Sequence, residues 1–253
     1  GVGNVHIGYR AGFQVSGSYN VTMGMYAGQG GTSSAPYSTG TYNVALGYLA
    51  LAGFTTGYEN IAIGQSAGDA ITTGFKNVAI GSSALSSEDV GAGHVAIGGN
   101  ALVNQNFASA NNEFEANISI GNKSSHNNTT GNMNVVIGTA AKYTDDEGNQ
   151  TTAIGHQAMY SQNMASSTTT GNVGVGHKVG YYNVTGTGNT WLGYQAGAGA
   201  SGQSNSDNVG IGYGALTTVT TGGGNVAIGH GAGDTLTSGH SNVFIGKSAG
   251  DYV

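Results

Sequence analysis

The sequence predicts an all-β protein, a parallel β-solenoid (β-roll) of about fourteen 17-residue coils. The first observation is a motif, Asn-Val-x-Ile-Gly-x-x-Ala, which fits the chain fourteen times. The second is its period, because eight of the thirteen steps between motifs are 17 residues and only one is shorter. A fixed short period is typical of solenoids, in which each repeat contacts only its neighbours. The third is composition, since 48 glycines in such short repeats leave no space for helices of normal length.

Position 1 of the repeat opens each coil and is asparagine in twelve copies. Stacked asparagine side chains can hydrogen-bond from coil to coil, so we expect a ladder at this position. The fourteen residues are Asn4, Asn20, Asn43, Asn60, Asn77, His94, Asn117, Asn134, Thr151, Asn172, Asn189, Asn208, Asn225 and Asn242.

Positions 2 to 4 predict a short strand, because apolar and β-branched residues alternate with small ones. Position 4 is apolar in every copy, and position 2 is valine or isoleucine in twelve. We therefore expect positions 2 and 4 to face the interior and position 3 to face outward. Position 3 is small in ten copies: Thr22, Ala45, Ala62, Ala79, Ala96, Ser119, Ala153, Gly174, Gly210 and Ala227. The exceptions, which we expect to mark wider places, are His6, Val136, Trp191 and Phe244.

Position 5 is glycine in every copy, which predicts a corner that needs positive φ or a close backbone approach. These structural glycines are Gly8, Gly24, Gly47, Gly64, Gly81, Gly98, Gly121, Gly138, Gly155, Gly176, Gly193, Gly212, Gly229 and Gly246. None of them stands in the complete Gly-x-x-x-x-Gly-Lys-Ser/Thr pattern of a phosphate-binding loop. Position 8, alanine in twelve copies, is expected to be a second inward position, followed by a short second strand and a turn.

Composition excludes several classes of function. The net charge is −6 with only six lysines and arginines, which argues against nucleic-acid binding. No run is apolar enough to insert into a membrane, and the absence of cysteine excludes disulfides and thiolate metal sites. No metal site or cofactor is expected. The whole of 1–253 is predicted to be one continuous repeat region, a fragment of a longer chain, with insertions near 29–38 and 103–116.

A single coil encloses few large apolar side chains, so one chain looks marginally stable alone. The flat face of small residues at position 3 suits close packing against another copy. We therefore predict a homotrimer whose chains share this face.

The motif also resembles repeats of known proteins. Asn77-Val78-Ala79-Ile80-Gly81 looks like the repeat of YadA-type trimeric autotransporter adhesin heads. It is similar to repeats in phage tail-fibre shafts, which often carry a turn like Thr55-Thr56-Gly57. The resemblance covers the whole chain and implies a left-handed, trimeric β-roll on a virion or a bacterial cell surface. It implies no catalytic residues. The mostly 17-residue repeat is longer than that of the adhesin heads and favours the tail-fibre side.

Position 6 provides the main candidate binding surface. Rings stacked there would form an interrupted aromatic ladder able to bind a glycan, or they would only shield the glycine corners or fill grooves between chains. The tentative ligand-binding residues are Tyr9, Tyr48, His156, His177, Tyr194, Tyr213 and His230.

Carboxylates offer two weaker candidates. The pair Glu113 and Glu115 in the second insertion is the only hint of polysaccharide cleavage, which needs paired carboxylates. The acidic run 145–147 is expected to be a turn rather than a calcium site. Threonine pairs at a 17-residue spacing also allow an ice-binding face.

Our leading interpretation is a non-enzymatic segment of an extracellular fibre that presents a receptor-binding tip. Its main partner is expected to be further copies of the same chain. The alternative is an adhesin head that binds a cell-surface glycan or a protein receptor through its own surface.

Overall fold

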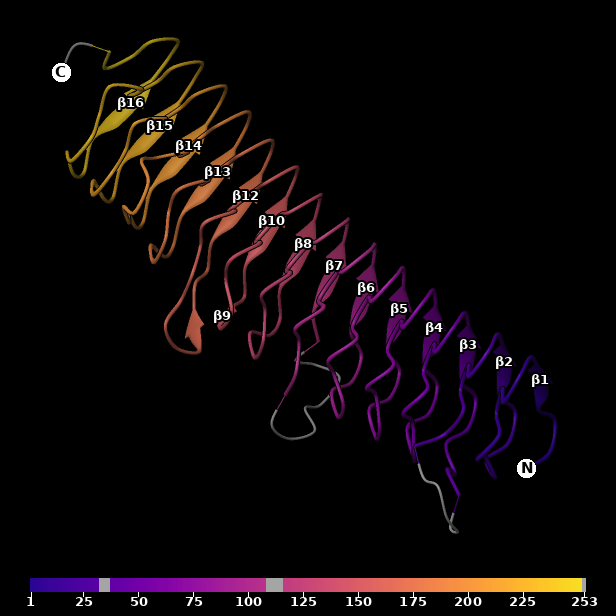
Figure 1. Ribbon diagram of the computed structural model, residues 1–253. Coiled ribbons are helices and arrows are strands. Elements are labelled where there is room, and N and C mark those ends of the chain that lie inside the picture. The colour runs from indigo at the N-terminus through magenta and orange to yellow at the C-terminus, as the bar shows by residue number, and fades with distance from the viewer. Residues whose placement is uncertain (32–36, 108–115, 252–253) are drawn as a thin grey trace. The chain divides into compact units, whose positions relative to one another are not determined.

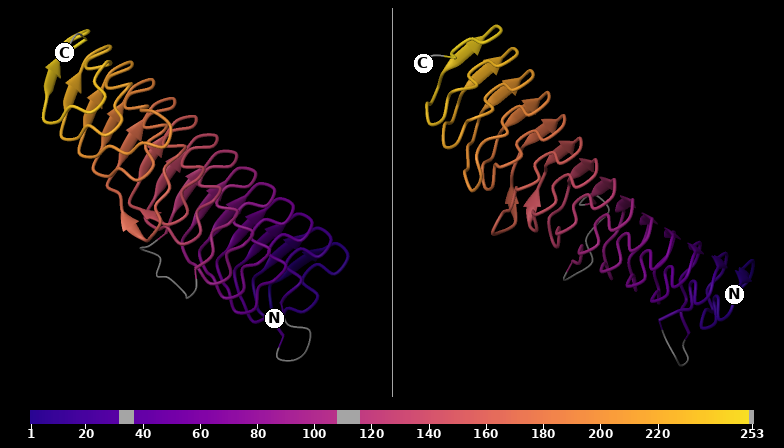
Figure 2. Two further views of the ribbon diagram at one scale, coloured as in Figure 1. Left: turned by 60° about the vertical axis from the view of Figure 1, so that its left-hand side comes forward. Right: turned by 45° about the horizontal axis from the view of Figure 1, so that its top comes forward.

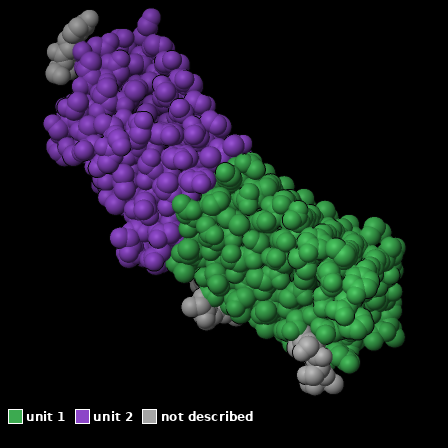
Figure 3. All heavy atoms as spheres, viewed as in Figure 1, with its two compact units in different colours: residues 1–130 green, residues 131–253 purple. Residues whose placement is uncertain are grey.

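The structure is a computed structural model that describes residues 1–31, 37–107 and 116–251. The chain forms two compact units, Gly1–Thr130 and Gly131–Val253, which Figure 3 shows in different colours. Within the described residues every element is a strand, and none forms a helix long and apolar enough to cross a membrane. Each unit holds seven copies of the repeat, so the two can be compared coil by coil.

Each copy of the repeat contributes one three-residue strand at positions 2 to 4, as predicted (Figure 1). The first unit contains β1 (Val5–Ile7), β2 (Val21–Met23), β3 (Val44–Leu46), β4 (Ile61–Ile63), β5 (Val78–Ile80), β6 (Val95–Ile97) and β7 (Ile118–Ile120). The second contains β8 (Val135–Ile137), β9 (Gly148–Asn149), β10 (Thr152–Ile154), β11 (Thr168–Thr169), β12 (Val173–Val175), β13 (Thr190–Leu192), β14 (Val209–Ile211), β15 (Val226–Ile228) and β16 (Val243–Ile245).

Within each unit the strands pair in parallel with their repeat positions in phase. In the first unit, for example, Ile61 pairs with Val78, Ala62 with Ala79 and Ile63 with Ile80. Figure 2 shows the successive strands of each unit side by side in both views. The predicted all-β parallel β-solenoid is therefore confirmed, with about 13 turns in all.

The second strand that the sequence predicted for each coil is largely missing. Among the described residues, only β9 and β11 form a second sheet, and three isolated bridges occur elsewhere. The reason is backbone conformation, because positions 7 and 9 have positive φ in coil after coil. Ser66 and Leu51, with φ of 51° and 49°, are examples at positions 7 and 9. Left-handed residues cannot continue an extended strand, so the chain turns instead.

The glycine corners combine positive φ with close approach between coils. All fourteen position-5 glycines have φ between 122° and 141°. A methyl group on Gly47 would lie 2.6 Å from the carbonyl oxygen of Gly64 in the next coil. No other residue tolerates both conditions, which explains why glycine stands at this position in every repeat.

The inside and outside of the strand are opposite to the prediction. Position 3 faces the interior: Ala62 is 1% exposed, whereas its neighbour Ile61 at position 2 is 37% exposed. Positions 2 and 4 are partly or largely exposed in every strand. The alternation was predicted correctly, but the apolar face was wrongly taken to be the interior one. In most coils the interior beside position 3 is narrow and holds only a small side chain, while Val136 and Trp191 are larger residues that are also buried at this position.

Asparagine at position 1 is buried and forms the expected ladder. The side-chain oxygen of Asn43 accepts a hydrogen bond from the backbone nitrogen of Asn60 at 3.0 Å and from its side-chain nitrogen at 3.1 Å. The Asn60 amide also donates to the carbonyl oxygen of Gly74 at 2.8 Å. The pattern recurs along both units, for example from Asn208 to Asn225. Each buried amide is satisfied by the neighbouring coils, which stitches successive coils together.

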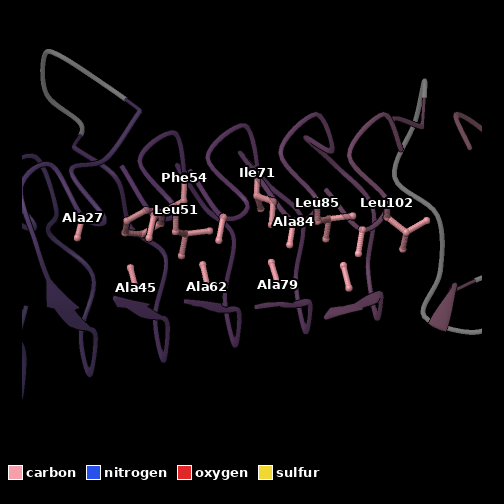
Figure 4. Close-up of a cluster of buried hydrophobic side chains, with 14 residues drawn as sticks. Ala27, Ala45, Leu51, Phe54, Ala62, Ile71, Ala79, Ala84, Leu85 and Leu102 are labelled. Atoms are coloured by element: carbon pink, nitrogen blue, oxygen red, sulfur yellow. The ribbon is translucent and has the colours of Figure 1, made fainter. Parts of the chain in front are cut away.

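Apolar side chains from the turns complete the interior of the first unit. Figure 4 shows Ala45, Ala62 and Ala79 pointing from the strands toward larger side chains such as Leu51 and Phe54 on the opposite side of the coil. Position 8 is inward, as expected, since its alanines are buried in nearly every coil. The core is thus a single file of methyl groups facing a row of larger residues.

In the second unit Trp191 is the large exception at position 3, and it is only 1% exposed. Its two partners in the sheet, Gly174 and Gly210, have no side chain. A methyl group on Gly210 would lie 2.7 Å from the indole, and one on Gly180 would lie 3.0 Å away. The indole therefore occupies space that the glycines of adjacent coils leave open.

Candidate functional site

Of the seven position-6 residues predicted to bind a ligand, five form one continuous ladder in the second unit. The rings stack in the order His156, His177, Tyr194, Tyr213 and His230, with centroids 4.9–5.2 Å apart and planes within 12° of parallel. Each ring follows a glycine corner of nearly identical conformation, so the side chains leave successive coils in the same direction. Their spacing is close to that of neighbouring strands.

The other two residues, Tyr9 and Tyr48, lie in the first unit and do not stack on one another. Tyr26, at position 7, contacts both through ring edges, with centroids 5.6 Å from Tyr9 and 6.4 Å from Tyr48. Position 6 of the following coils holds Gln65 and Ser82, which carry no ring. The aromatic ladder is therefore interrupted in the first unit and continuous in the second.

The stacked geometry changes what the ladder can bind. Each inner ring has both faces against a neighbouring ring, so the ladder offers ring edges to solvent. Tyr194 and Tyr213 are 41% and 55% exposed. Sugar rings stack on aromatic faces, and here those faces are already covered. The ladder can thus donate and accept hydrogen bonds through phenol and imidazole edges, but its inner rings cannot act as a stacking platform.

A second column of rings, not predicted from the sequence, lies at position 10 of the same unit. Tyr143, Tyr160 and Tyr181 stack with centroids 5.2 Å apart. Their sequence spacing, one coil each, was a signal that could have revealed them. Tyr182 stands nearly perpendicular to Tyr181, with centroids 4.6 Å apart and an angle of 85°.

A small pocket opens where this column ends. Its lining residues are Lys178, Tyr181, Tyr182, Gln195 and Ala198, and its volume is about 80 Å³. The ammonium of Lys178 lies 5.2 Å from the centroid of the Tyr181 ring, within range of a cation–π interaction. Burial, followed by the neighbouring phenols, raises the pKa of Tyr181, so its hydroxyl stays protonated at neutral pH.

A larger hollow, of about 340 Å³, lies in the last described coils and is lined by residues 235–239 together with Asn242 and Phe244. Leu236 occupies the place that Val219 holds one coil earlier, where the side chain is fully buried. The hollow therefore corresponds to the inside of a coil, and we do not assign it a ligand.

The acidic run 145–147 supplies the carboxylate of a buried ion pair, which the prediction of a simple acidic turn missed. Lys142 and Asp145 are both fully buried, and their charged atoms lie 3.0 Å apart. Asp145 also accepts hydrogen bonds from the backbone nitrogens of Gly148 and Met164, and Gln162 donates to it at 2.7 Å. Burial raises the pKa of Asp145, but the attraction of Lys142 and these hydrogen bonds outweigh it and hold the pKa below its usual range.

A second buried polar pair, Glu88 and His94, lies in the first unit. The His94 Nδ1 accepts a hydrogen bond from the backbone nitrogen of Asn117 at 3.0 Å, as an asparagine oxygen does in other coils. Burial lowers the pKa of His94 to about 4, so the ring is neutral with its proton on Nε2. That atom lies 3.9 Å from a carboxyl oxygen of Glu88, too far for a hydrogen bond. Both buried pairs stand at repeat positions whose side chains point into the coil, so we assign them to the packing of the interior.

The remaining predictions concern parts that the structure does not describe. Glu113 and Glu115 lie outside the described residues, as does most of the second insertion. Among the described residues, no group of three or more histidine, aspartate or glutamate side chains is placed to hold a metal ion. No family model, curated protein or solved structure matches the chain.

Proposed function

We propose that this chain is a non-catalytic structural segment of an extracellular trimeric fibre, such as the shaft of a phage tail fibre, that presents a receptor-binding tip. The observation that carries the proposal is the apolar outer face of the sheet. Positions 2 and 4 hold valine, isoleucine, leucine or methionine in nearly every coil, yet they face outward. Those more than a third exposed are Val5, Ile7, Met23, Ile61, Ile118, Val173, Leu192, Ile228, Val243 and Ile245.

An outer face of this kind favours a protein partner. Parallel sheets are usually covered on both faces, and contiguous apolar surface is rarely left to water. A second copy of the chain supplies the same row of branched side chains at the same coil spacing, so the two rows can interlock along each unit. A closed ring of copies satisfies every such face. The trimer thus stays our proposal, but through positions 2 and 4 in place of position 3.

The interior supports a mechanical role. Hydrogen bonds between coils run along each unit through the backbone and the position-1 asparagines. A left-handed coil, the virion or cell-surface location and the choice of three copies follow from the resemblance to tail-fibre and adhesin repeats.

Sedimentation and light scattering test the proposal. We expect particles of three chains, each of 25.1 kDa. Ile61→Lys places a charge on the outer face of β4 and should shift the particles toward monomers. Gln65→Lys, in the same coil but at exposed position 6, is the matched control and should leave them trimeric. A wild-type protein that stays monomeric at micromolar concentration would overturn the proposal.

The absence of catalysis is tested separately. The protein should release no reducing ends from bacterial polysaccharides. Release that is lost in Glu113→Gln would instead establish a depolymerase.

A second candidate function, an adhesin head that binds a glycan through its own surface, is favoured by the small pocket at Tyr182. The pocket lies in the turn after the strand, away from positions 2 and 4, so the two functions do not compete for the same residues.

A further inference from the structure

We infer that the pocket formed by Lys178, Tyr181, Tyr182 and Gln195 binds a single six-membered sugar ring that carries a carboxylate. This inference goes beyond the fibre role and does not depend on the number of copies. It rests on a break in an aromatic column, on the charge beside that break and on unused hydrogen-bonding groups.

The break in the column leaves room for one ring. Tyr143, Tyr160 and Tyr181 repeat with ring centroids 5.2 Å apart, close to the spacing of neighbouring strands, so each coil adds one ring to the column. At the same place in the next coil stands Ala198, which carries only a methyl group. The pocket lies at this substitution, and its volume of about 80 Å³ admits one ring seated part-way into the surface. An extended ligand would need several times that space.

Two tyrosines form the walls of the pocket. Tyr181 and Tyr182 meet at 85°, which makes an aromatic corner, and Tyr182 is 38% exposed. The C–H faces of a pyranose pack against phenol rings, while the ring hydroxyls remain free for hydrogen bonds. In this respect the corner differs from the position-6 ladder, whose inner faces are covered by their neighbours.

Charge selects the kind of sugar. Lys178 forms no ion pair within the described part of the chain, and none of the other lining residues is charged. Its ammonium is therefore available to the carboxylate of a ligand, even though the net charge of the protein is −6. The attraction strengthens at the edge of an aromatic corner, where water is partly excluded.

Gln195 supplies the remaining polar contact. Its backbone nitrogen donates to the carbonyl oxygen of His177 at 2.9 Å, which fixes the residue on the coil. Its side-chain amide makes no hydrogen bond to any described residue, so both its oxygen and its nitrogen can meet sugar hydroxyls. A carboxylate for Lys178, a C–H face for the tyrosines and hydroxyls for Gln195 together describe a uronic acid.

Saturation-transfer NMR titrations with three probes test the inference. D-glucuronate carries both features, D-glucose has the ring without the carboxylate, and acetate has the carboxylate without the ring. We expect glucuronate to bind with a dissociation constant on the order of 1 mM, and each of the other two at least about 5-fold more weakly. Equal binding of glucuronate and glucose, or of glucuronate and acetate, would overturn the inference, as would no binding of glucuronate.

Variants assign the binding to this pocket. Lys178→Met should reduce glucuronate affinity to that of glucose, and Tyr182→Ser should weaken both sugars. Lys123→Met is the matched control, because Lys123 holds the same repeat position but is followed by His126 and Asn127 where the pocket has Tyr181 and Tyr182. It should leave glucuronate binding unchanged. Equal losses in both lysine variants would mean general charge attraction and would refute the site. Sedimentation of the same samples gives the number of chains in each particle, so a failure of the fibre proposal can be told apart from a failure of glucuronate binding.

Discussion

The same backbone coil is filled in two different ways. In coils of the first unit, Leu51, Phe54 and Ile71 fill the side of the interior opposite the strand. At the start of the second unit, Lys142 and Asp145 take the places that correspond to Leu51 and Phe54. Strand, glycine corner and asparagine ladder are alike in both. The positions that recur from copy to copy therefore determine the backbone of the coil, while the side chains at positions 9 and 12 can be apolar or ionic.

The comparison shows that the polar filling depends on complete pairing. Leu51 needs only contact, whereas Lys142 needs Asp145, and Asp145 in turn uses Gln162 and two backbone nitrogens. A buried ion pair contributes little net stability compared with an apolar pair, but the loss of one partner leaves an uncompensated charge. The two regions should thus respond very differently to single substitutions.

The largest effect is expected for Lys142→Met. The side chain keeps its length, but Asp145 loses its counter-charge in the interior, and we expect a loss of about 3–5 kcal/mol of unfolding free energy. Native-state hydrogen exchange of amides in residues 134–163 measures it, because repeat arrays need not unfold in one step. Lys247→Met is the control, the same substitution at an exposed cation of the same unit, and should cost less than about 0.5 kcal/mol. Similar small losses in both variants would contradict the comparison.

The second effect is a pH dependence in the first unit, from His94. Its folded pKa of about 4 lies below its ordinary value of 6.5, so between these values the unfolded chain binds more protons than the folded one. Stability is therefore full above pH 6.5 and falls by about 3 kcal/mol as the pH drops to 4. The pKa of Glu88 is raised, chiefly by burial, and acts in the opposite sense, because stability then falls as the pH rises above 4.5.

A Glu88→Gln background removes that opposing contribution and keeps the oxygen that accepts from Gly91. In this background, adding His94→Asn restores the repeat's usual residue and should flatten the acid-side loss, measured by urea unfolding at pH 4 to 7. Adding His240→Asn, at an exposed histidine, should leave the loss in place. An unchanged pH profile after His94→Asn would show that another group controls it.

The third effect concerns how Trp191 fits the second unit. In the first unit, Ala62 pairs with Ala79 at position 3, whereas Trp191 pairs with Gly210. Gly210→Ala should cost about 1–3 kcal/mol, because the new methyl group meets the indole 2.7 Å away. In a Trp191→Ala background the same change recreates the alanine pair of the first unit and should be nearly neutral. Thermal unfolding of the four proteins in this cycle gives the coupling, and additive losses would refute the packing argument.

The sequence predicted the backbone of the coil but not the side chains that fill its interior. The period, the glycine corners and the asparagine ladder follow from residues that recur in every copy. Which face of the strand points inward could not be deduced, because the alternation of Ala62 and Ile61 defines two faces without showing which one is buried. The burial of Lys142 and Asp145 was not predicted, because position 12 holds residues as different as Phe54 and Glu88 and gives no periodic apolar signal. The pocket depends on the coincidence of Lys178, Tyr181 and Tyr182 in one coil, which a repeat average hides.

The smallest effect separates the two sets of position-6 rings. Tyr213 stacks on rings on both sides, whereas Tyr48 has, within the described residues, a single ring contact, edge-on with Tyr26. Tyr213→Ala should therefore cost about 1 kcal/mol, and Tyr48→Ala less than half as much, because stacked pairs add to simple burial. Urea unfolding followed by tyrosine fluorescence measures both.

A loss confined to Tyr213→Ala would assign the continuous ladder a structural role, since rings that stabilise their neighbours are fixed by stacking rather than held ready for a ligand. If both variants kept full stability, stacking would not be what holds the ladder in place. Its exposed edges would then be the first surface to test against cell-surface glycans with Tyr194→Ala and Tyr213→Ala.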